Sequence, residues 1–459
     1  MTAHTSDLVV LGGGSAGYAA ALRAAELGRS VVLIERDRVG GTCLHRGCIP
    51  TKALLHAAEI ADQVRAAASI GIDATLNGID ATAVASFRDR IVAKKFAGLE
   101  GLIKTRGITV VAGEGRLLVD AAGPAIAVGD DLYRGTDVVL ATGSSTRTLP
   151  GLDIGGRVIT SEQALALTEV PTSVVVLGGG VIGVEFASAW RSLGAEVTII
   201  EALDHLVPNE DIALSAALER AFRRRGIAFR VGARLASATQ NDSDVTVTVE
   251  DGTALTADYL LVAVGRGPAT AGLGYEEAGV GLDRGFVVVD ERLRTTVPHV
   301  WAAGDIVAGL QLAHRGFQQG VFVAEEIAGL SPVAVPETTI PRITYTHPEV
   351  ASVGVTEVQA RAAHGDAVTA CEYNLAGNGR SEILGTGGIV KVVRITGGPI
   401  IGVHLVGDRV GELITEGQLA VGWEAHPEDI APFIHGHPTQ SEALGEAFLA
   451  LAGKPLHAL

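Results

Sequence analysis

Residues 7–35 read DLVVLGGGSAGYAAALRAAELGRSVVLIE, and this stretch decides the fold. A short apolar run at 7–11 ends in three glycines. An alanine-rich segment with helical periodicity follows at 15–27, and a second apolar run at 30–35 ends in Glu35. This order predicts a strand, a helix and a second strand parallel to the first, which is the context that gives a glycine-rich motif its meaning.

The motif has three glycines at fixed spacing: Gly12, Gly14 and Gly17. The first permits a tight turn, the second lets the backbone approach a pyrophosphate, and the third lets the helix pack closely on the strand. Ser15 and Ala16 begin the helix, whose N-terminus offers N–H groups and a positive dipole end to phosphate. Glu35 is placed to accept a hydrogen bond from a ribose hydroxyl. The motif therefore predicts a dinucleotide site.

The same pattern recurs in a second copy, with strands at 173–177 and 196–201 around a helix at 184–193. The step from the first glycine to the glutamate is 23 residues in both copies, from Gly12 to Glu35 and from Gly178 to Glu201. The long apolar runs without alternation are typical of parallel sheets buried on both faces. The chain therefore contains an internal repeat on the scale of a nucleotide-binding domain.

Residues 40–52, GGTCLHRGCIPTK, contain Cys43 and Cys48. A regular helix would place the two cysteines about 140° apart, whereas a disulfide needs Cα atoms about 4.4–6.8 Å apart. The backbone between them is therefore expected to be irregular, with Gly47 supplying the bend and Pro50 in the first turn of a following helix. Beside two dinucleotide sites, the pair predicts electron transfer between a nicotinamide, a flavin and a disulfide. The alternative is a pair of structural cysteines.

The position of the cysteines indicates which nucleotide each copy binds. The first copy carries the thiols, so its cofactor is expected to be a flavin, FAD, and the second copy then binds the nicotinamide. Glu201 is followed by ALDHL at 202–206, with no arginine for a 2′-phosphate, which favours NAD(H) over NADP(H).

Composition limits the remaining possibilities. A chain of 459 residues fits three or four domains, and a net charge of −16 argues against a nucleic-acid partner. The longest apolar stretch, 174–182, is about half of a membrane span. Three cysteines are too few for a secreted disulfide framework, so a cytoplasmic location is expected. Cys371, the odd one, is expected to be a small buried hydrophobe.

Two further groups of polar residues are candidates for chemistry. HGHPTQSE at 435–442 places two histidines near a glutamate, and His437 is the candidate base because histidine titrates near neutrality. Lys52 lies in the first turns of the helix after the cysteines, where a lysine is usually solvated; the alternative is a pair with a buried carboxylate, for which Glu185 is the candidate. The cysteine spacing does not fit a zinc site, and no metal is expected.

The rest of the chain predicts the domain organisation. Residues 57–103 are expected to be largely helical, with breaks near 71 and 78, and the C-terminal part mixes antiparallel strands with helices at 411–422 and 441–451. The predicted fold is α/β, with two doubly wound nucleotide domains, a central segment and an α+β interface domain. The expected boundaries are 1–149 (FAD), 150–267 (NAD), 268–335 (central) and 336–459 (interface).

Together these motifs resemble the flavin-dependent pyridine nucleotide-disulfide oxidoreductases, and within them the dihydrolipoamide dehydrogenases. The resemblance runs from end to end and rests on seven segments: 41–44, 47–52, 141–144, 303–305, 312–314, 345–349 and 437–442. It implies a homodimer in which Cys43 exchanges with lipoamide, Cys48 lies against the flavin, and Lys52 and Glu185 form an ion pair near it. It also implies that His437, oriented by Glu442, acts as acid–base from the partner subunit, with a cis His437–Pro438 bond.

The cofactor-binding residues expected from the motifs and the resemblance are Gly12, Gly14, Ser15, Ala16, Gly17, Glu35, Arg36, Gly41, Thr42, Lys52, Gly115, Ala141, Thr142, Gly143, Ser144, Gly178, Gly180, Val181, Ile182, Gly183, Glu201, Gly265, Asp305, Leu312, Ala313 and His314. Asp305 is implied near the ribityl and phosphate of the flavin. Residues 312–314 are implied to meet its ring.

The implied reaction oxidises a protein-bound dihydrolipoyl group with NAD+, and the implied partners are lipoyl domains of a 2-oxoacid dehydrogenase complex or of a glycine cleavage system. One alternative is a reductase of a glutathione- or mycothiol-type disulfide, and another is a non-catalytic flavoprotein scaffold. The chain departs from the family at His45 and Arg46, where asparagine and valine are commoner, and at 265–268 and 375–380.

Overall fold

The computed structural model describes residues 2–458, which form two compact units. Unit 1 consists of Met1–Ala53, Ala83–Arg147 and Gly265–Glu337, and unit 2 of Leu54–Thr82, Thr148–Val264 and Thr338–Leu459. Met1 and Leu459, the outer ends of the first and last predicted domains, lie outside the described residues. Between residues 2 and 458, no helix has the length and hydropathy needed to cross a membrane.

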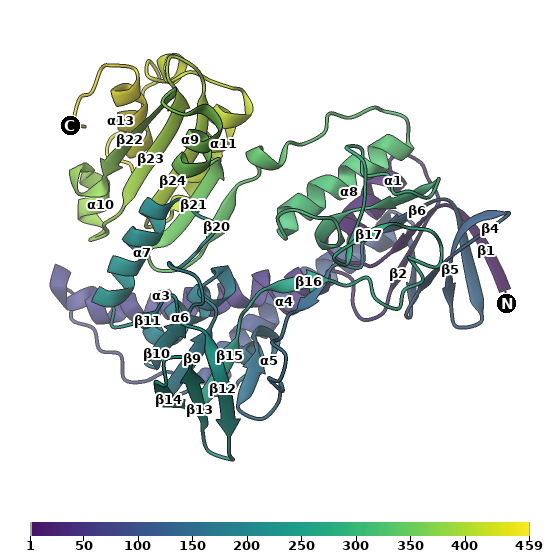
Figure 1. Cartoon of the computed structure of the whole chain (residues 1–459), viewed down its shortest axis with the longest axis horizontal. Helices are drawn as coiled ribbons and strands as arrows, with labels where there is room; N and C mark the ends of the chain where they lie inside the picture. Colours follow the sequence, from purple (N-terminus) through teal and green to yellow (C-terminus); the bar gives the residue numbers. More distant parts are fainter. Residues whose placement is uncertain (1, 459) are drawn as a thin grey trace. The chain divides into compact units, whose positions relative to one another are not determined.

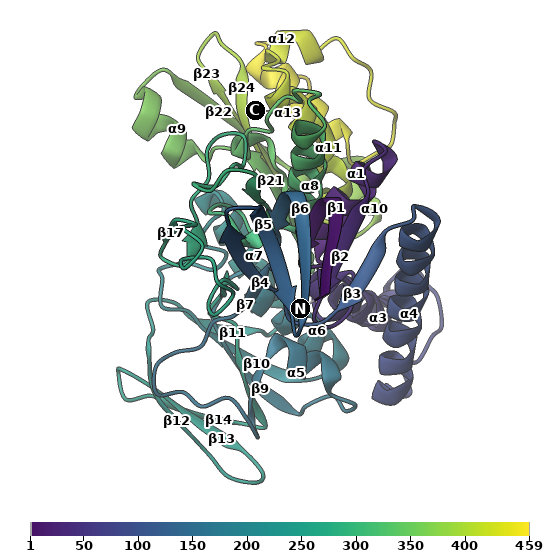
Figure 2. The ribbon, with the colours of Figure 1, turned by 90° about the vertical axis from the view of Figure 1, so that its right-hand side faces the viewer.

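Unit 1 is built on a sheet whose parallel strands include β3-β2-β1-β6 in that order (Figure 2), and β19 pairs with β6 on its other side. These strands are β1 (Thr2–Leu11), β2 (Val31–Glu35), β3 (Thr109–Ala112), β6 (Asp131–Leu140) and β19 (Val300–Ala302). The first half of β6 also pairs with an antiparallel arm, β4 (Arg116–Asp120) and β5 (Gly123–Val128). Two small ribbons complete the unit: β7 (Ser144–Thr146) with β16 (Arg266–Pro268), and β17 (Leu282–Asp283) with β18 (Phe286–Val287).

Two helices, α1 (Ser15–Glu26) and α8 (Ala313–Ile327), pack together on one face of this sheet (Figure 1). Their approach is close because α1 is rich in alanine, and a Cβ on Gly320 would overlap the carbonyl oxygen of Ala16. The remaining helices that begin or lie in this unit are α2 (Gly41–His45), α3 (Cys48–Ala66), α4 (Ala81–Thr105) and the 3-10 turn η2 (Gly304–Ile306).

Unit 2 repeats the arrangement, with parallel strands in the order β11-β10-β9-β15-β8. They are β8 (Val158–Thr160), β9 (Ser173–Leu177), β10 (Glu196–Ile200), β11 (Ala228–Arg230) and β15 (Tyr259–Val262). Helices α6 (Val181–Leu193) and α7 (Ile212–Arg224) share an apolar core with one face, near the short α5 (Ser161–Ala166). The other face packs on a meander: β12 (Leu235–Gln240), β13 (Val245–Val249) and β14 (Ala254–Ala257).

The C-terminal part of unit 2 is an antiparallel sheet in the order β20-β21-β24-β23-β22. Its strands are β20 (Arg342–Thr344), β21 (Glu349–Gly354), β22 (Val368–Asn374), β23 (Ile389–Ile395) and β24 (Ile400–Gly407). Helices α11 (Val410–Gly422) and α13 (Glu442–Leu451) share a core with this sheet, and α9 (Glu357–His364) packs in a smaller cluster. Short elements complete it: α10 (Gly379–Ile383), α12 (Pro427–Ile430), η3 (Glu337–Thr339) and η4 (Leu375–Gly377).

The predicted fold class is confirmed, since both glycine motifs join parallel strands to helices and the C-terminal part is α+β. The long helical prediction at 57–103 is confirmed as well. There α3 and the turn η1 (Ala67–Ile70) are separated from α4 by residues 71–80 without regular structure. The exact domain boundaries stay a prediction.

Candidate active site

In the first glycine motif, the turn between β1 and α1 requires glycine. Gly12 has a φ of +102°, which residues with a side chain rarely adopt, and a Cβ on Gly17 would overlap the carbonyl oxygen of Gly12. Glu35, the last residue of β2, accepts hydrogen bonds from the N–H groups of Gly13 (2.6 Å) and Asp37 (2.9 Å). The glutamate therefore fixes the loop beside it.

The second motif has the same geometry. Gly178 has a φ of +110°, and a Cβ on Gly183 would overlap the carbonyl oxygen of Gly178. Glu201 is buried directly after β10 and accepts hydrogen bonds from the N–H groups of Gly179 (2.6 Å) and Leu203 (2.7 Å). The repeat seen in the sequence is thus a repeat of hydrogen bonds.

Both motifs fit a dinucleotide. Gly14 and Gly180 are the N-caps of α1 and α6, and within residues 2–458 neither helix start has a hydrogen bond from a capping side chain. A Cβ added at either glycine would meet no atom within 4 Å. Both helix starts therefore have open space beside the capping glycine, where a pyrophosphate could accept hydrogen bonds from first-turn N–H groups.

The redox segment is irregular, as predicted. Cys43 lies in α2, Arg46 ends that short helix, and Cys48 begins α3. The two cysteine side chains are hydrogen-bonded to each other. The bend at Gly47 thus brings together two sulfurs that one continuous helix would separate.

This segment packs on the first glycine motif. A Cβ on Gly41 would lie 2.7 Å from the Cα of Gly14, and Cys43 is hydrogen-bonded to Ser15 at the start of α1. The bond with Cys48 and burial raise the pKa of the Cys43 thiol, whereas the charge of Lys52 and the Ser15 bond act in the opposite direction. The dithiol therefore lies beside the helix start where nucleotide phosphate is expected.

The two unusual residues of the redox loop are bound within unit 1. His45 makes a 2.9 Å hydrogen bond with the carbonyl oxygen of Val39, and its ring meets Phe96 edge-on at 5.0 Å. Arg46 forms an ion pair with Asp37. These contacts hold the end of α2 against the loop after β2, so both side chains fasten the redox loop.

Ser144 and Asp305 are brought together from distant parts of unit 1. Ser144 Oγ donates to Asp305 Oδ2 at 2.6 Å, and Arg266 donates to Ser144 Oγ at 2.8 Å and to its carbonyl at 2.7 Å. Arg266 was not among the predicted site residues, and its only signal in the sequence is its place directly after Gly265. Arg266 therefore fixes Ser144, which is one of the residues expected to bind the flavin.

The other predicted residues of unit 1 lie at the ends of its strands and helices. Thr142 Oγ1 donates to the carbonyl of Ala269 at 2.7 Å and lies 3.0 Å from the hydroxyl of Tyr275. Arg36 lies 3.9 Å from Glu114, next to Gly115, whose missing Cβ makes room for apolar neighbours. Leu312 is the N-cap of α8, with Ala313 and His314 in its first turn, and Ala141 and Gly143 flank Thr142 after β6.

In unit 2, Glu185 lies in the first turns of α6 with only 3 % of its surface exposed. Its Oε1 accepts a 2.9 Å hydrogen bond from the N–H of Tyr345. Val181 and Ile182 form the helix start before it. The predicted pairing of Glu185 with Lys52 joins residues of different units and stays a prediction.

The predicted acid–base pair is formed within unit 2. His437 Nδ1 lies 2.8 Å from Glu442 Oε1, and Glu442 Oε2 accepts a 2.7 Å hydrogen bond from the N–H of Thr439. Burial opposes ionisation of Glu442, but the bonds from Thr439 and His437 lower the pKa of the carboxyl overall. The carboxylate therefore orients the imidazole and leaves Nε2 for chemistry.

The backbone beside this pair contains a cis bond. His437–Pro438 is cis, which confirms the prediction. Asn378 is buried, and its side-chain amide donates a 2.9 Å hydrogen bond to the carbonyl of Thr439. Asn378 was not among the predicted site residues, and no local motif connects it with Thr439, which lies 61 residues away.

A second histidine–glutamate pair supports the same loop. His435 Nε2 lies 2.8 Å from Glu416 Oε1 on α11, and its ring lies against Gly445, where a Cβ would come within 2.6 Å. The hydrogen bond with Glu416 raises the pKa of His435 above its ordinary value of 6.5. The loop before His437 is thus anchored to both α11 and α13.

We expect this His435–Glu416 pair to stabilise the fold most at acid pH. Because the folded pKa of His435 is raised, the stabilisation is complete below its unfolded pKa and is lost as the pH rises through the folded value. The melting temperature of the wild type should exceed that of Glu416→Gln most near pH 6, and the difference should narrow towards pH 9. A difference that stays constant over this range contradicts the interpretation.

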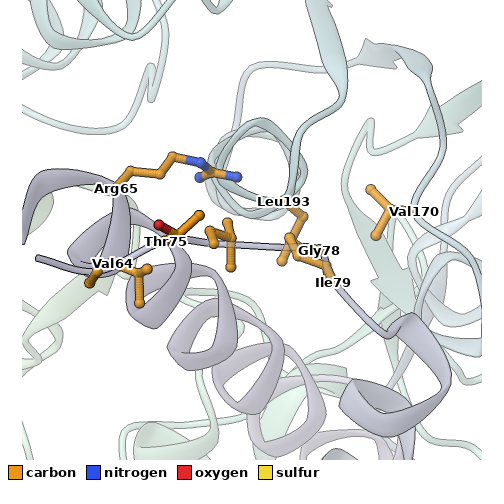
Figure 3. Close-up of a pocket in the computed structure, with 9 residues that line it drawn as sticks. Val64, Arg65, Thr75, Gly78, Ile79, Val170 and Leu193 are labelled. Atoms are coloured by element: carbon orange, nitrogen blue, oxygen red, sulfur yellow. The ribbon is translucent and has the colours of Figure 1, made fainter.

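A separate cavity of about 540 Å³ lies in unit 2 (Figure 3). Its walls come from α3, from the loop before α4, and from Val170 and Leu193. They are mostly apolar and contain none of the predicted site residues. Among residues 2–458, no three His, Cys, Asp or Glu side chains are grouped as a metal site.

Comparison with known proteins assigns the family. The family model described as pyridine nucleotide-disulphide oxidoreductase matches residues 6–320, and the model of that family's dimerisation domain matches residues 340–448. The chain belongs to the pyridine nucleotide-disulphide oxidoreductases. The redox loop, the acid–base pair and both nucleotide motifs described above lie within the matched ranges of this family.

Individual relatives within the family match over almost the whole chain. A dihydrolipoyl dehydrogenase of Bacillus subtilis (strain 168) is 38% identical, covering 98% of this chain and 99% of the relative. The crystal structure of LpdA from Mycobacterium tuberculosis matches with a TM-score of 0.89 and 30% identity, covering 98% of this chain and 100% of that one. The flavoprotein disulfide reductase RclA of Escherichia coli matches with a TM-score of 0.86 and 28% identity, covering 97% and 99%.

Proposed function

We propose that this chain is a dihydrolipoyl dehydrogenase, which oxidises a protein-bound dihydrolipoyl group to lipoyl and reduces NAD+ to NADH. The observation that carries the proposal is the hydrogen-bonded pair Cys43 and Cys48, packed against the first glycine motif through Gly41 and Ser15. Relatives named dihydrolipoyl dehydrogenase, 38% identical over 98% of the chain in the Bacillus subtilis case, support the choice of substrate.

Exchange between the lipoyl dithiol and the cysteine disulfide needs no further oxidant or reductant. Starting from the Cys43–Cys48 disulfide, a dihydrolipoyl thiolate attacks Cys43 Sγ, the Cys43–Cys48 bond breaks, and a mixed disulfide forms. The second lipoyl thiol then displaces Cys43, so the lipoyl group leaves as a disulfide and both cysteines are reduced. His437 Nε2 removes the proton of the attacking thiol, and the Glu442 carboxylate stabilises the imidazolium.

The two nucleotide motifs complete the electron path. The first motif and its redox segment fit FAD, and the second, with Glu201 buried and acidic, fits NAD+. FAD, when bound, supplies two-electron transfer between the dithiol and NAD+. We also propose the other site roles predicted from the sequence, including the pairing of Lys52 with Glu185. The four predicted domain boundaries are part of the same proposal. The cytoplasmic location stays a prediction.

The family assignment also bears on the oligomeric state of the chain. The match of residues 340–448 to the dimerisation domain of the family supports a homodimer. We further propose that His437 reaches the dithiol of the partner subunit, and that the substrate is the lipoyl domain of a 2-oxoacid dehydrogenase complex or a glycine cleavage system. A mixture of His437→Gln and Cys48→Ser subunits tests the first point, because only a shared site restores activity in mixed dimers.

The first experiment follows NADH formation when the purified flavoprotein is given dihydrolipoamide and NAD+. Turnover with NAD+ and little with NADP+ supports the proposal. In a parallel series, oxidised glutathione and mycothiol disulfide are offered with NADH or NADPH. Reduction of either disulfide without oxidation of dihydrolipoamide would keep the electron path and change the substrate, and absence of all these activities would favour a scaffold.

Single alanines at the two motifs separate the cofactors. Gly17→Ala is expected to reduce bound flavin, and Gly183→Ala to keep the flavin but weaken NAD+ binding about 10-fold or more, because each Cβ overlaps a carbonyl oxygen inside its own motif. Flavin absorbance per subunit and NAD+ titration calorimetry measure the two effects. Equal loss of both cofactors in both variants would contradict the assignment of one nucleotide to each motif.

A further inference from the structure

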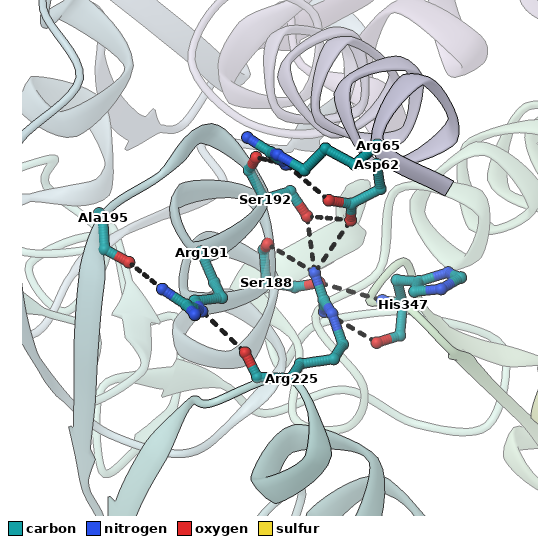
Figure 4. Close-up of polar contacts among 8 residues, drawn as sticks. All are labelled: Asp62, Arg65, Ser188, Arg191, Ser192, Ala195, Arg225 and His347. Atoms are coloured by element: carbon teal, nitrogen blue, oxygen red, sulfur yellow. Dashed lines mark hydrogen bonds and ion pairs between the residues drawn. The ribbon is translucent and has the colours of Figure 1, made fainter. Parts of the chain in front are cut away.

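Arg225 is the centre of a polar network in unit 2 (Figure 4). It is the C-cap of α7, its side chain is 17% exposed, and its guanidinium makes five hydrogen bonds. Nη1 donates to Ser188 Oγ and to the carbonyl of His347, both at 2.8 Å. Nη2 donates to Ser192 Oγ at 2.6 Å and to Asp62 Oδ2 at 3.3 Å.

These partners come from three separate parts of the chain. Asp62 lies on α3, the helix that begins at Cys48, and Ser188 and Ser192 lie on α6, the helix of the second glycine motif. His347 belongs to the segment between β20 and β21. A lysine cannot replace such a planar fork of donors, so the site is specific for arginine.

Segment 345–347 is attached to α6 at regular intervals. The N–H of Tyr345 donates to Glu185 Oε1 at 2.9 Å, and the N–H of His347 donates to Ser188 Oγ at 3.0 Å. Alternate residues of an extended segment face one side, and residues three apart on a helix share a face. The segment therefore lies along one face of α6, and Arg225 binds its far end through the His347 carbonyl.

We infer that Arg225 is a positioning residue for Glu185. Its guanidinium locks residues 345–347 onto α6, and the locked segment presents the Tyr345 N–H that fixes the buried Glu185 carboxylate. The inference rests on the proposed function, because Glu185 enters the chemistry only through its proposed pairing with Lys52. Nothing in the reaction touches Arg225, so its effect passes through Glu185.

The main test compares Arg225→Met with Ser188→Ala in the holoenzyme. Hydrogen exchange measured by mass spectrometry should become faster in residues 342–349 for both variants. The kcat for dihydrolipoamide oxidation should fall roughly 10-fold to 100-fold for Arg225→Met, because displacement of a reacting group by about 1 Å has an effect of that size. The KM for NAD+ should change less than about threefold. If Arg225→Met does not fold, hydrogen exchange and kcat of Ser188→Ala test the inference instead.

The control is Arg65→Met. Arg65 is another arginine of the same network, binding Asp62 Oδ1 at 2.9 Å and the carbonyl of Ser192, but it has no hydrogen bond to segment 345–347. Exchange in residues 342–349 and kcat should both stay at the wild-type level. If Arg65→Met reproduces the effects of Arg225→Met, general loosening explains them and the inference is overturned.

A double-mutant cycle tests the route through Glu185. Ser188→Ala added to Glu185→Gln should slow the enzyme little beyond Glu185→Gln alone, because coupled residues are not additive. Full additivity, or unchanged exchange in 342–349 for both variants, overturns the inference. If the wild type does not oxidise dihydrolipoamide, the proposed function is wrong. Hydrogen exchange remains a separate test, because unchanged exchange in 342–349 of Arg225→Met and Ser188→Ala would still overturn the role of Arg225.

Discussion

Cys48→Ser is expected to lower the rate of dihydrolipoamide oxidation by NAD+ roughly 10⁴-fold or more. The proposed reaction needs two sulfurs, since Cys43 forms the mixed disulfide with the lipoyl group, and Cys48 is the group that leaves the Cys43–Cys48 disulfide and later reforms that bond. A hydroxyl cannot do either. The hydrogen bond between the two side chains places them within reach of each other.

The same variant should keep the path from nicotinamide to flavin. NADH-dependent reduction of ferricyanide bypasses the dithiol, so it should remain within a few-fold of wild type, together with the bound flavin. Cys371→Ser is the matched control, because this third cysteine is half-buried in β22, in the C-terminal sheet of unit 2, and should leave both activities unchanged. Dihydrolipoamide turnover by Cys48→Ser above about 1% of wild type would disprove a role for the pair.

His437→Gln is expected to lower the same rate by about 10² to 10⁴-fold, the range of general acid–base catalysis. Glutamine keeps the size and one polar contact but cannot accept a proton from a thiol. Glu442→Gln should have a smaller effect of about tenfold, because the amide oxygen can still accept from His437 Nδ1, whereas the charge and the bond from the Thr439 N–H are lost. The pH dependence of kcat/KM measures both variants.

His457→Gln supplies the control for this comparison. His457 pairs with Glu446 at 2.8 Å, the same kind and length of contact on the same helix, but it belongs to the C-terminal tail. Its loss should change stability without changing the pH profile. Equal effects of His457→Gln and His437→Gln on kcat/KM would show that any histidine–glutamate pair of this domain merely supports the fold.

Local spacing explains what the sequence could predict. The motifs that include Gly12 and Gly178 join neighbouring elements, so residues close together in the sequence determine their geometry. The bend between Cys43 and Cys48 follows in the same way, because a five-residue step on a helix is incompatible with a bond between the sulfurs. The pairing of His437 with Glu442 spans only five residues, so it could also be predicted from the sequence.

Distant contacts explain what the sequence could not predict. Arg225 meets His347 across 122 residues and Asp62 across 163, so no periodicity or motif connects them. Its neighbours, three further arginines at 220, 223 and 224, give the run the look of a solvated basic helix end. Only the packing of α3, α6 and α7 distinguishes Arg225 from the rest.

The double use of Glu201 has an evolutionary consequence. Both of its oxygens already accept N–H groups of the motif, from Gly179 and Leu203, so the residue proposed to select NAD+ also holds its own binding loop together. A descendant that adopted NADP+ by losing this acid would leave both N–H donors, the buried one of Gly179 and the one of the exposed Leu203, without this acceptor. Such a lineage would first have to acquire replacement acceptors, which makes the coenzyme preference of this chain slow to drift.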